Sequence, residues 1–169
     1  MYSPKTIQYF NNQKNYGRIK NPDGIGKVGN IVCGDVMWLY IKLGKNKKGE
    51  EVIKDIKYET FGCVAAIATS GQVTELAKGK TIAEALAISK DAIISELGGL
   101  PPIKVHCSVL AVDALAEAIY DYFSKNKKPI PEDLQRQHEV ISESRGIIED
   151  KYHDWIAAEE KMHEAGRER

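Results

Sequence analysis

The sequence predicts an α+β fold in which helices pack on one face of a small antiparallel sheet, with a helical C-terminal extension. Two segments rich in β-branched and aromatic residues come early in the chain, and segments with helical periodicity follow them. A short polar loop joins the two strand-like segments, which favours a hairpin. The 169 residues suffice for one compact domain with a short appendage. We therefore expect a folded domain over residues 1–128 and a charged helical tail over residues 129–169.

The first helix is predicted to begin at Ser3 and Pro4, because serine caps exposed amides and proline fits the first turn. Turn-forming residues dominate from Asn21 to Asn30, so we expect a glycine-rich turn there that leads into a strand. The glycines within residues 24–29 match a dinucleotide-binding pattern formally. We reject nucleotide binding because no strand is predicted before this string and no helix after it.

Two strands are predicted, over residues 36–43 and 52–61, from their β-branched and aromatic content. The second also alternates between apolar and charged residues, as a strand with one buried face does. The loop between them, residues 44–49, is polar and bounded by glycines. This arrangement indicates an antiparallel hairpin.

Three helices are predicted after the hairpin. The first covers residues 64–78 and ends at a glycine, and the second has an apolar face over residues 82–97 behind a capping box formed by Thr81 and Glu84. The two prolines that follow, at 101 and 102, predict an extended link. The last core helix is expected to start near Ser108 and to continue past residue 119.

The tail differs in composition from the rest of the chain, with 11 acidic and 6 basic residues, and Gly146 divides it. Its second half predicts an amphipathic helix whose apolar face we expect to lie on the core or on another subunit, with a dedicated partner site as the alternative. That face consists of Ile148, Tyr152, Trp155 and Ile156. The three tail histidines are 15 and 10 residues apart, too far for a helical pair of metal ligands, so we expect them to be solvated. They are His138, His153 and His163.

The overall composition excludes several classes of protein. Hydrophobic residues make up 43% and charged residues 28%, which is typical of a globular protein. Lys plus Arg and Asp plus Glu both number 24, so no basic surplus indicates nucleic-acid binding. Without a long apolar run or an apolar leader, no membrane association is expected, and the chain is predicted to be cytoplasmic. An odd count of 3 cysteines without close pairs fits a reducing compartment.

The cysteines are the most informative residues for function. Cys33 precedes the first predicted strand, while Cys63 and Cys107 lie at predicted helix starts, where partial positive charge favours a thiolate. Asp35 and His106 each stand within two positions of a cysteine. Each cysteine taken alone is better explained as a small buried residue, but that explanation does not account for their common placement at element ends.

Three thiolates with one harder donor, either Asp35 or His106, suit a tetrahedral iron or zinc site. The absence of a C-x-x-C pair counts against an ordinary zinc finger, and ligands drawn from three separate loops favour a labile site. A cysteine hydrolase is disfavoured, because a histidine directly before Cys107 is poorly placed to act as its base.

Three ordered motifs in residues 1–125 resemble the IscU/NifU-type iron–sulfur cluster assembly scaffold family. They are Gly24-x-Gly26-x-Val28-Gly29-Asn30 leading into Cys33-Gly34-Asp35-Val36-Met37, then Lys57-Tyr58-Glu59-Thr60-Phe61-Gly62-Cys63, then Leu100-Pro101-Pro102-Ile103-Lys104-Val105-His106-Cys107-Ser108. The resemblance implies that a nascent [2Fe-2S] cluster is held by five residues. These are Cys33, Asp35, Cys63, His106 and Cys107. It also implies a chaperone-docking segment at Leu100, Pro101, Pro102, Ile103 and Lys104, with Ile103 where the family has valine.

The implied activity is that of a scaffold and not of an enzyme. Sulfur would arrive as persulfide from a cysteine desulfurase, iron would bind, and the cluster would pass to apo-proteins. An electron donor such as a ferredoxin, an Hsp70-type chaperone and a second copy of the chain are further expected partners. Two alternatives remain open, a zinc-bound sulfur acceptor with sulfurtransferase turnover and a structural zinc domain.

The chain also departs from the family pattern in two places. Val64-Ala65-Ala66 follows Cys63 where many relatives have smaller or more polar residues, and no counterpart is recognised for the tail beyond Lys125. The zinc-dependent sulfurtransferase branch carries an insertion before the third cysteine and lacks the adjacent histidine. With His106 present and 43 residues between Cys63 and Cys107, the scaffold branch is the better match.

Overall fold

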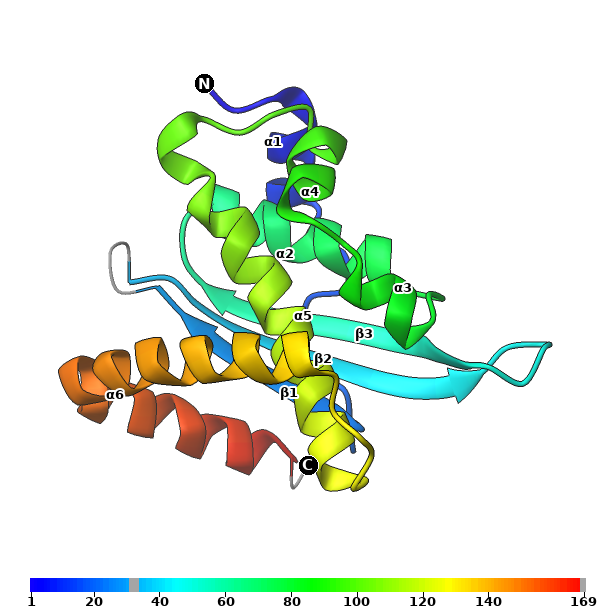
Figure 1. Cartoon of the computed structure of the whole chain (residues 1–169). Helices are drawn as coiled ribbons and strands as arrows, with labels where there is room; N and C mark the ends of the chain where they lie inside the picture. Colours follow the sequence, from blue (N-terminus) through cyan, green and yellow to red (C-terminus); the bar gives the residue numbers. More distant parts are fainter. Residues whose placement is uncertain (31–33, 168–169) are drawn as a thin grey trace.

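The computed structural model describes residues 1–30 and 34–167, with side chains described continuously to residue 146 apart from that gap, and at three positions beyond it. A three-stranded antiparallel sheet in the order β1-β2-β3 is followed by helices (Figure 1), and two of its strands, β2 and β3, were predicted. The elements are α1 (Pro4–Asn11), β1 (Gly24–Gly29), β2 (Val36–Lys45), β3 (Glu51–Phe61), α2 (Val64–Ala77), α3 (Ile82–Leu86), α4 (Lys90–Glu96), the 3₁₀ turn η1 (Pro102–Lys104), α5 (His106–Lys125) and α6 (Glu132–Arg167).

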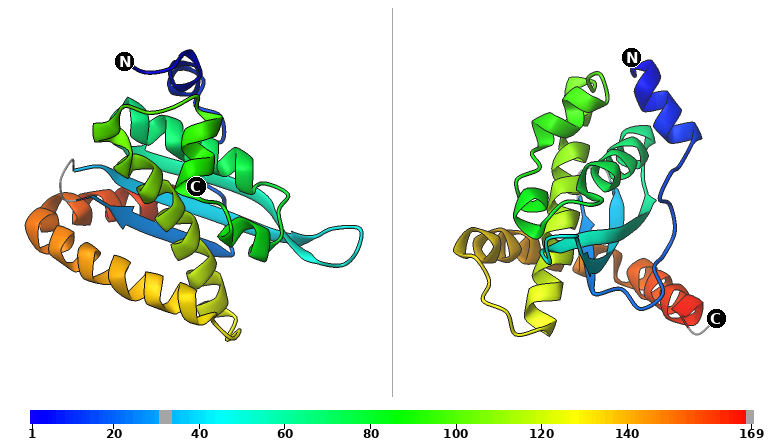
Figure 2. Two further views of the ribbon diagram at one scale, coloured as in Figure 1. Left: turned by 45° about the horizontal axis from the view of Figure 1, so that its top comes forward. Right: turned by 90° about the vertical axis from the view of Figure 1, so that its right-hand side faces the viewer.

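The main core lies between the sheet and helices α2 and α5, which cover the same face (Figures 1 and 2). Leu39 and Ile41 of β2 point into this core and are fully buried. The alternate residues Trp38 and Tyr40 are buried on the opposite face with Ile19 from the N-terminal segment. The prediction of helices packed on one face of a small antiparallel sheet is therefore confirmed.

The glycine-rich string forms the edge strand β1, so the prediction of a turn was wrong. Helix α5 crosses directly over this strand. A Cβ atom at Gly24 would lie 2.1 Å from the carbonyl oxygen of Ala118, and one at Gly26 would lie 2.0 Å from that of Ala114. The glycines are therefore required for close approach of the helix backbone and not for a turn.

The helical region differs from its prediction in three places. Residues 82–97 form two short helices, because Ser89 accepts a hydrogen bond from the N–H of Ala92 and starts a new helix there. The predicted capping box at the start of α3 is confirmed. Pro102 opens the turn η1 where an extended link was expected, since proline fits a first helical turn. Helix α5 begins at His106, two residues before the predicted start.

The tail is helical from Glu132 to Arg167 (α6), and the division expected at Gly146 does not appear as a non-helical segment. Figures 1 and 2 show that α6 reverses its direction between its orange and red parts. Leu134 and Ile141 are buried where the first half packs on α5. The predicted apolar face lies outside the described side chains: Ile148, Tyr152, Trp155 and Ile156. Among the described residues no helix is long and apolar enough to cross a bilayer.

The expectation of solvated tail histidines was wrong for His138. Its ring stacks on Tyr120 at a centroid distance of 3.6 Å, and its Nδ1 lies 2.9 Å from a carboxylate oxygen of Glu117. His153 and His163 lie outside the described side chains. The spacing of histidines along one helix does not reveal a contact with another helix.

Candidate functional site

The predicted ligand residues gather where three segments meet at one end of the sheet. Asp35 immediately precedes β2, Cys63 immediately precedes α2, and Cys107 lies in the first turn of α5. Strands β2 and β3 pair with Val36 opposite Phe61. This pairing brings Asp35, just before β2, close to Cys63, just after β3. Helices α2 and α5 pack against each other and begin at the same end of the sheet (Figure 1). The path of the chain thus directs the three side chains to one place.

Two thiols and one carboxylate form a compact triangle. Sγ of Cys63 lies 3.9 Å from Sγ of Cys107 and 3.8 Å from Oδ2 of Asp35. Sγ of Cys107 lies 3.7 Å from the same oxygen. His106 joins the group, because its ligand atom and those of Asp35 and Cys107 all lie within 4.8 Å of one another. The remaining predicted ligand, Cys33, lies outside the described residues.

Asp35 is the unusual member of this group because the residue is only 3% exposed. The backbone N–H of Cys63 donates a hydrogen bond to its Oδ1 over 3.3 Å. A buried carboxylate beside two thiols is costly in a neutral interior, and a bound cation would offset that cost. Soft sulfur, hard carboxylate and imidazole together suit iron or zinc. The donor set therefore fits a site that receives a metal ion or a cluster.

Both thiols lie where a helix begins, close to a lysine. Cys63 occupies the N-cap position of α2 and Cys107 the first turn of α5, so each faces the positive end of a helix. Lys104 stands beside them. The negative charge of Cys63 raises the pKa of Lys104, and a hydrogen bond to the same sulfur adds to this effect.

Gly62 allows the close approach of Asp35 to Cys63. A Cβ atom at this position would lie 2.8 Å from Oδ1 of Asp35 and 2.8 Å from Cβ of Ala66. Any larger residue would therefore displace either the carboxylate or the first turn of α2. The glycine directly before Cys63 belongs to the site as a positioning residue.

Tyr2 was not predicted as part of the site. Its side chain packs with Cys63, Cys107 and Leu100 in a small apolar cluster next to the ligands. Burial raises the pKa of Tyr2, and the negative charge of nearby Cys63 adds to the shift. The hydroxyl of Ser3 donates to the carbonyl oxygen of Leu97 and so ties the start of the chain to this region. No sequence pattern signals this contact, because it joins segments almost one hundred residues apart.

The segment predicted to dock a chaperone lies at the edge of the site, directly before His106. Leu100 packs toward the ligands, whereas Pro102 and Ile103 are exposed, the latter at 78%. Phe61, two residues before Cys63 at the end of β3, is 65% exposed. Apolar residues that partners could contact therefore flank the ligands. The docking role of residues 100–104 itself stays a prediction.

Comparison with known proteins decides the family. Residues 1–129 match the family described as NifU-like N terminal domain. The chain belongs to this family. The predicted resemblance is thus confirmed, and the three motifs that carried it lie within the matched residues.

Relatives within the NifU-like family are similar over about three quarters of the chain. Iron-sulfur cluster assembly scaffold protein IscU 1 of Archaeoglobus fulgidus is 58% identical over 128 residues, which cover 76% of this chain and 80% of the relative. The IscU scaffold protein of Aquifex aeolicus is 43% identical over 124 residues, which cover 73% of this chain and 77% of the relative. That of Buchnera aphidicola subsp. Schizaphis graminum is 48% identical over 130 residues, 75% of this chain and 98% of the relative.

Solved structures have the same fold. The iron-sulfur cluster assembly scaffold protein for the SUF system from Fervidobacterium islandicum matches with a TM-score of 0.57 and 26% identity, over 70% of this chain and 96% of that one. The N-terminal part of a NifU-like protein from Brucella abortus matches with a TM-score of 0.55 and 21% identity, over 73% of this chain and 94% of that one. Both matches support the α+β architecture.

Proposed function

We propose that this chain is a scaffold on which an iron–sulfur cluster is assembled and from which the cluster passes to apo-proteins. The observation that carries this proposal is the triangle of Asp35, Cys63 and Cys107, with sulfur and oxygen atoms less than 4 Å apart. Membership of the NifU-like family and the names of its relatives support the same function. A structural zinc domain is not favoured.

The cluster is cargo in this proposal and not a resident cofactor. A [2Fe-2S] cluster would be bound by the sulfurs of Cys63 and Cys107 together with Cys33, and by Asp35 or His106 as the remaining donor. Carboxylate is a harder and weaker ligand for iron than thiolate. A site of this composition, drawn from the ends of separate elements, supports binding that is firm enough for assembly and reversible enough for transfer.

The chemistry of assembly sets the classes of partner. Sulfur from a cysteine desulfurase arrives as a persulfide, whose outer sulfur must gain two electrons to become sulfide. An electron donor such as a ferredoxin is therefore required in addition to iron and an acceptor apo-protein. An Hsp70-type chaperone is proposed to dock at residues 100–104, and the exposure of Ile103 supports this. The chain is proposed to act in the cytoplasm and to work as a scaffold without catalytic turnover.

Anaerobic reconstitution tests the proposed function. Metal-free protein is incubated with ferrous iron, cysteine, a reductant and a cysteine desulfurase, and the visible spectrum, iron and acid-labile sulfide are measured. We expect visible absorption and equal amounts of iron and sulfide. A colourless protein that binds zinc but gains no sulfide would overturn the scaffold proposal and favour a zinc-bound sulfur acceptor.

A further inference from the structure

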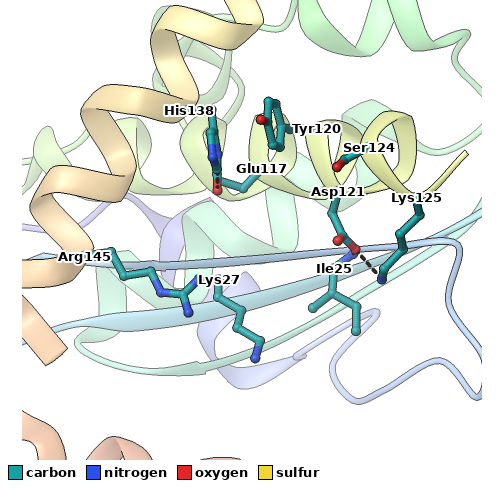
Figure 3. Close-up of a pocket in the computed structure, with 9 residues that line it drawn as sticks. All are labelled: Ile25, Lys27, Glu117, Tyr120, Asp121, Ser124, Lys125, His138 and Arg145. Carbon is teal, nitrogen blue, oxygen red and sulfur yellow. Dashed lines mark hydrogen bonds and ion pairs between the residues drawn. The ribbon is translucent and has the colours of Figure 1, made fainter. Parts of the chain in front are cut away.

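The first half of α6 packs on α5 through buried apolar side chains, and a histidine–carboxylate contact lies between them. Leu134 and Ile141 are buried on either side of His138. Nδ1 of His138 lies 2.9 Å and 3.1 Å from the two carboxylate oxygens of Glu117 on α5. Figure 3 shows the pair between the two helices. Tail docking therefore depends on a titratable pair at the centre of the helix contact.

The geometry fixes the imidazole ring tightly. The ring is stacked on Tyr120 with an angle of 8° between the planes, and its Nε2 lies 3.3 Å from the hydroxyl of Ser142. The side chain of His138 is 27% exposed and that of Glu117 only 9%. Both ring nitrogens thus have a partner, and the carboxylate lies in the less solvated position.

The other charged groups around the pair come from all three neighbouring elements. They line or border a polar cavity of about 370 Å³ between β1, α5 and α6 (Figure 3). These groups are Lys27 of β1, Asp113, Asp121 and Lys125 of α5, and Arg145 of α6. Asp113 accepts a hydrogen bond from Gln137, and Asp121 is paired with Lys125.

We propose that Glu117 and His138 form a proton-dependent clamp that holds the first half of α6 on α5 more tightly at mildly acidic than at mildly alkaline pH. This inference goes beyond the scaffold function, because Glu117 lies ten residues after Cys107, about 15 Å along the helix axis. The Buchnera relative is covered over 98% of its length by 130 aligned residues, so it lacks a counterpart of α6. The clamp thus controls an addition to the family domain.

The ionisation of Glu117 sets the direction of the pH dependence. Burial raises the pKa of Glu117, and the hydrogen bond from His138, with smaller effects of its charge and of Arg145, offsets this only in part. A group whose pKa is raised on docking stabilises the docked state at low pH, and this stabilisation is lost as the pH rises through the raised value. Ionisation of Glu117 as the pH rises therefore weakens docking.

Methyl NMR of the full-length chain tests the clamp. The methyl signals of Leu134 and Ile141 report docking, and those of Ile53 in the main core report the fold. Between about pH 6 and pH 8.5 we expect the opening equilibrium of α6 to rise about tenfold in the wild type, the effect of one charged hydrogen bond. Glu117→Gln keeps the shape and cannot ionise, so its opening should change less than about twofold over the same range. The Ile53 signal should stay constant in every variant.

Glu139→Gln is the matched control. It makes the same change of charge on the exposed side of α6, where Glu139 only accepts a hydrogen bond from Gln135, and it should keep the wild-type pH response. His138→Gln, which retains a donor but removes the ring stacked on Tyr120, gives an independent second variant and should show a reduced response. An Ile141 signal that is independent of pH in the wild type would overturn the clamp. A pH response of Glu117→Gln equal to that of the wild type would also overturn the clamp.

Discussion

Asp35 is buried, and its carboxylate lies close to the sulfurs of both Cys63 and Cys107. Its replacement is therefore the most informative test of cluster release. A carboxylate is a hard donor that exchanges on iron more readily than a thiolate. With Asp35→Ala, the cluster should be retained longer and transferred more slowly to an apo-ferredoxin, as followed by circular dichroism in the visible range.

The matched variant is His106→Ala, because His106 is the other non-thiolate donor in the group. Whichever residue is the actual fourth ligand should change the visible spectrum more when it is replaced. Identical transfer rates for Asp35→Ala and the wild type would contradict a role of Asp35 in release.

The thiols make a second prediction at the same scale. Cys33→Ala, Cys63→Ala and Cys107→Ala should each abolish a stable cluster, because thiolates are the usual ligands of cluster iron and the chain has only 3 cysteines. The metal-free variants should keep the helical signal in far-ultraviolet circular dichroism, since the main core is formed without them. A variant that retains the wild-type visible spectrum would show that its cysteine is not a ligand.

At the scale of the elements, the contact of β1 with α5 depends on glycine, which has no side chain, at positions 24 and 26. Gly26→Ala would place a Cβ atom 2.0 Å from the carbonyl oxygen of Ala114, a backbone atom that cannot move without shifting α5. We expect the free energy of unfolding to fall by about 3 kcal/mol, as for severe overpacking. Urea unfolding of the metal-free protein measures this change.

Gly44→Ala is the control for that substitution. Its new Cβ atom would contact only the flexible side chain of Lys54, at 3.0 Å and beyond. The urea midpoint of Gly44→Ala should therefore stay much closer to that of the wild type. Equal losses in the two variants would mean that general strand propensity, and not the approach of α5, explains the glycines.

At the scale of the whole molecule, the tail adds buried apolar surface to a domain that relatives possess without it. Ending the chain at Lys128 keeps the ion pair of Lys128 with Glu51 and removes Leu134 and Ile141 from the core. Two such side chains contribute about 3 kcal/mol or more to folding, so the truncated chain should unfold at a lower temperature. Calorimetry of both forms measures the difference.

The same truncation tests whether the tail assembles subunits or shields the cluster. If it does either, the truncated chain should elute as a smaller particle, or lose its cluster faster in air, than the full-length protein. Unchanged elution volume and cluster lifetime would assign the tail to an external partner. An unchanged unfolding temperature would show that the contacts of α6 with α5 contribute little to stability.

The sequence by itself determined the elements and residues whose signals are local. The strands predicted at residues 36–43 and 52–61 from β-branched content lie within one or two residues of the observed 36–45 and 51–61, and the start of α3 was predicted from Thr81 and Glu84. Of the predicted ligands, Asp35, Cys63, His106 and Cys107 do lie together. These features depend on backbone preferences and side-chain chemistry within a few residues, which a single sequence records directly.

Only the tertiary structure decided the features that depend on contacts between distant segments. The glycines of β1 predicted a turn, whereas the structure shows α5 packed against them. No local pattern predicted that Tyr2 lies beside Cys63. His138 was expected to be solvated, but it contacts Glu117 of another helix. Glycine, which has no side chain, is compatible both with a turn and with the close approach of a helix backbone to a strand. Which of the two a chain uses is set by how its elements pack, and local sequence carries little information about that packing.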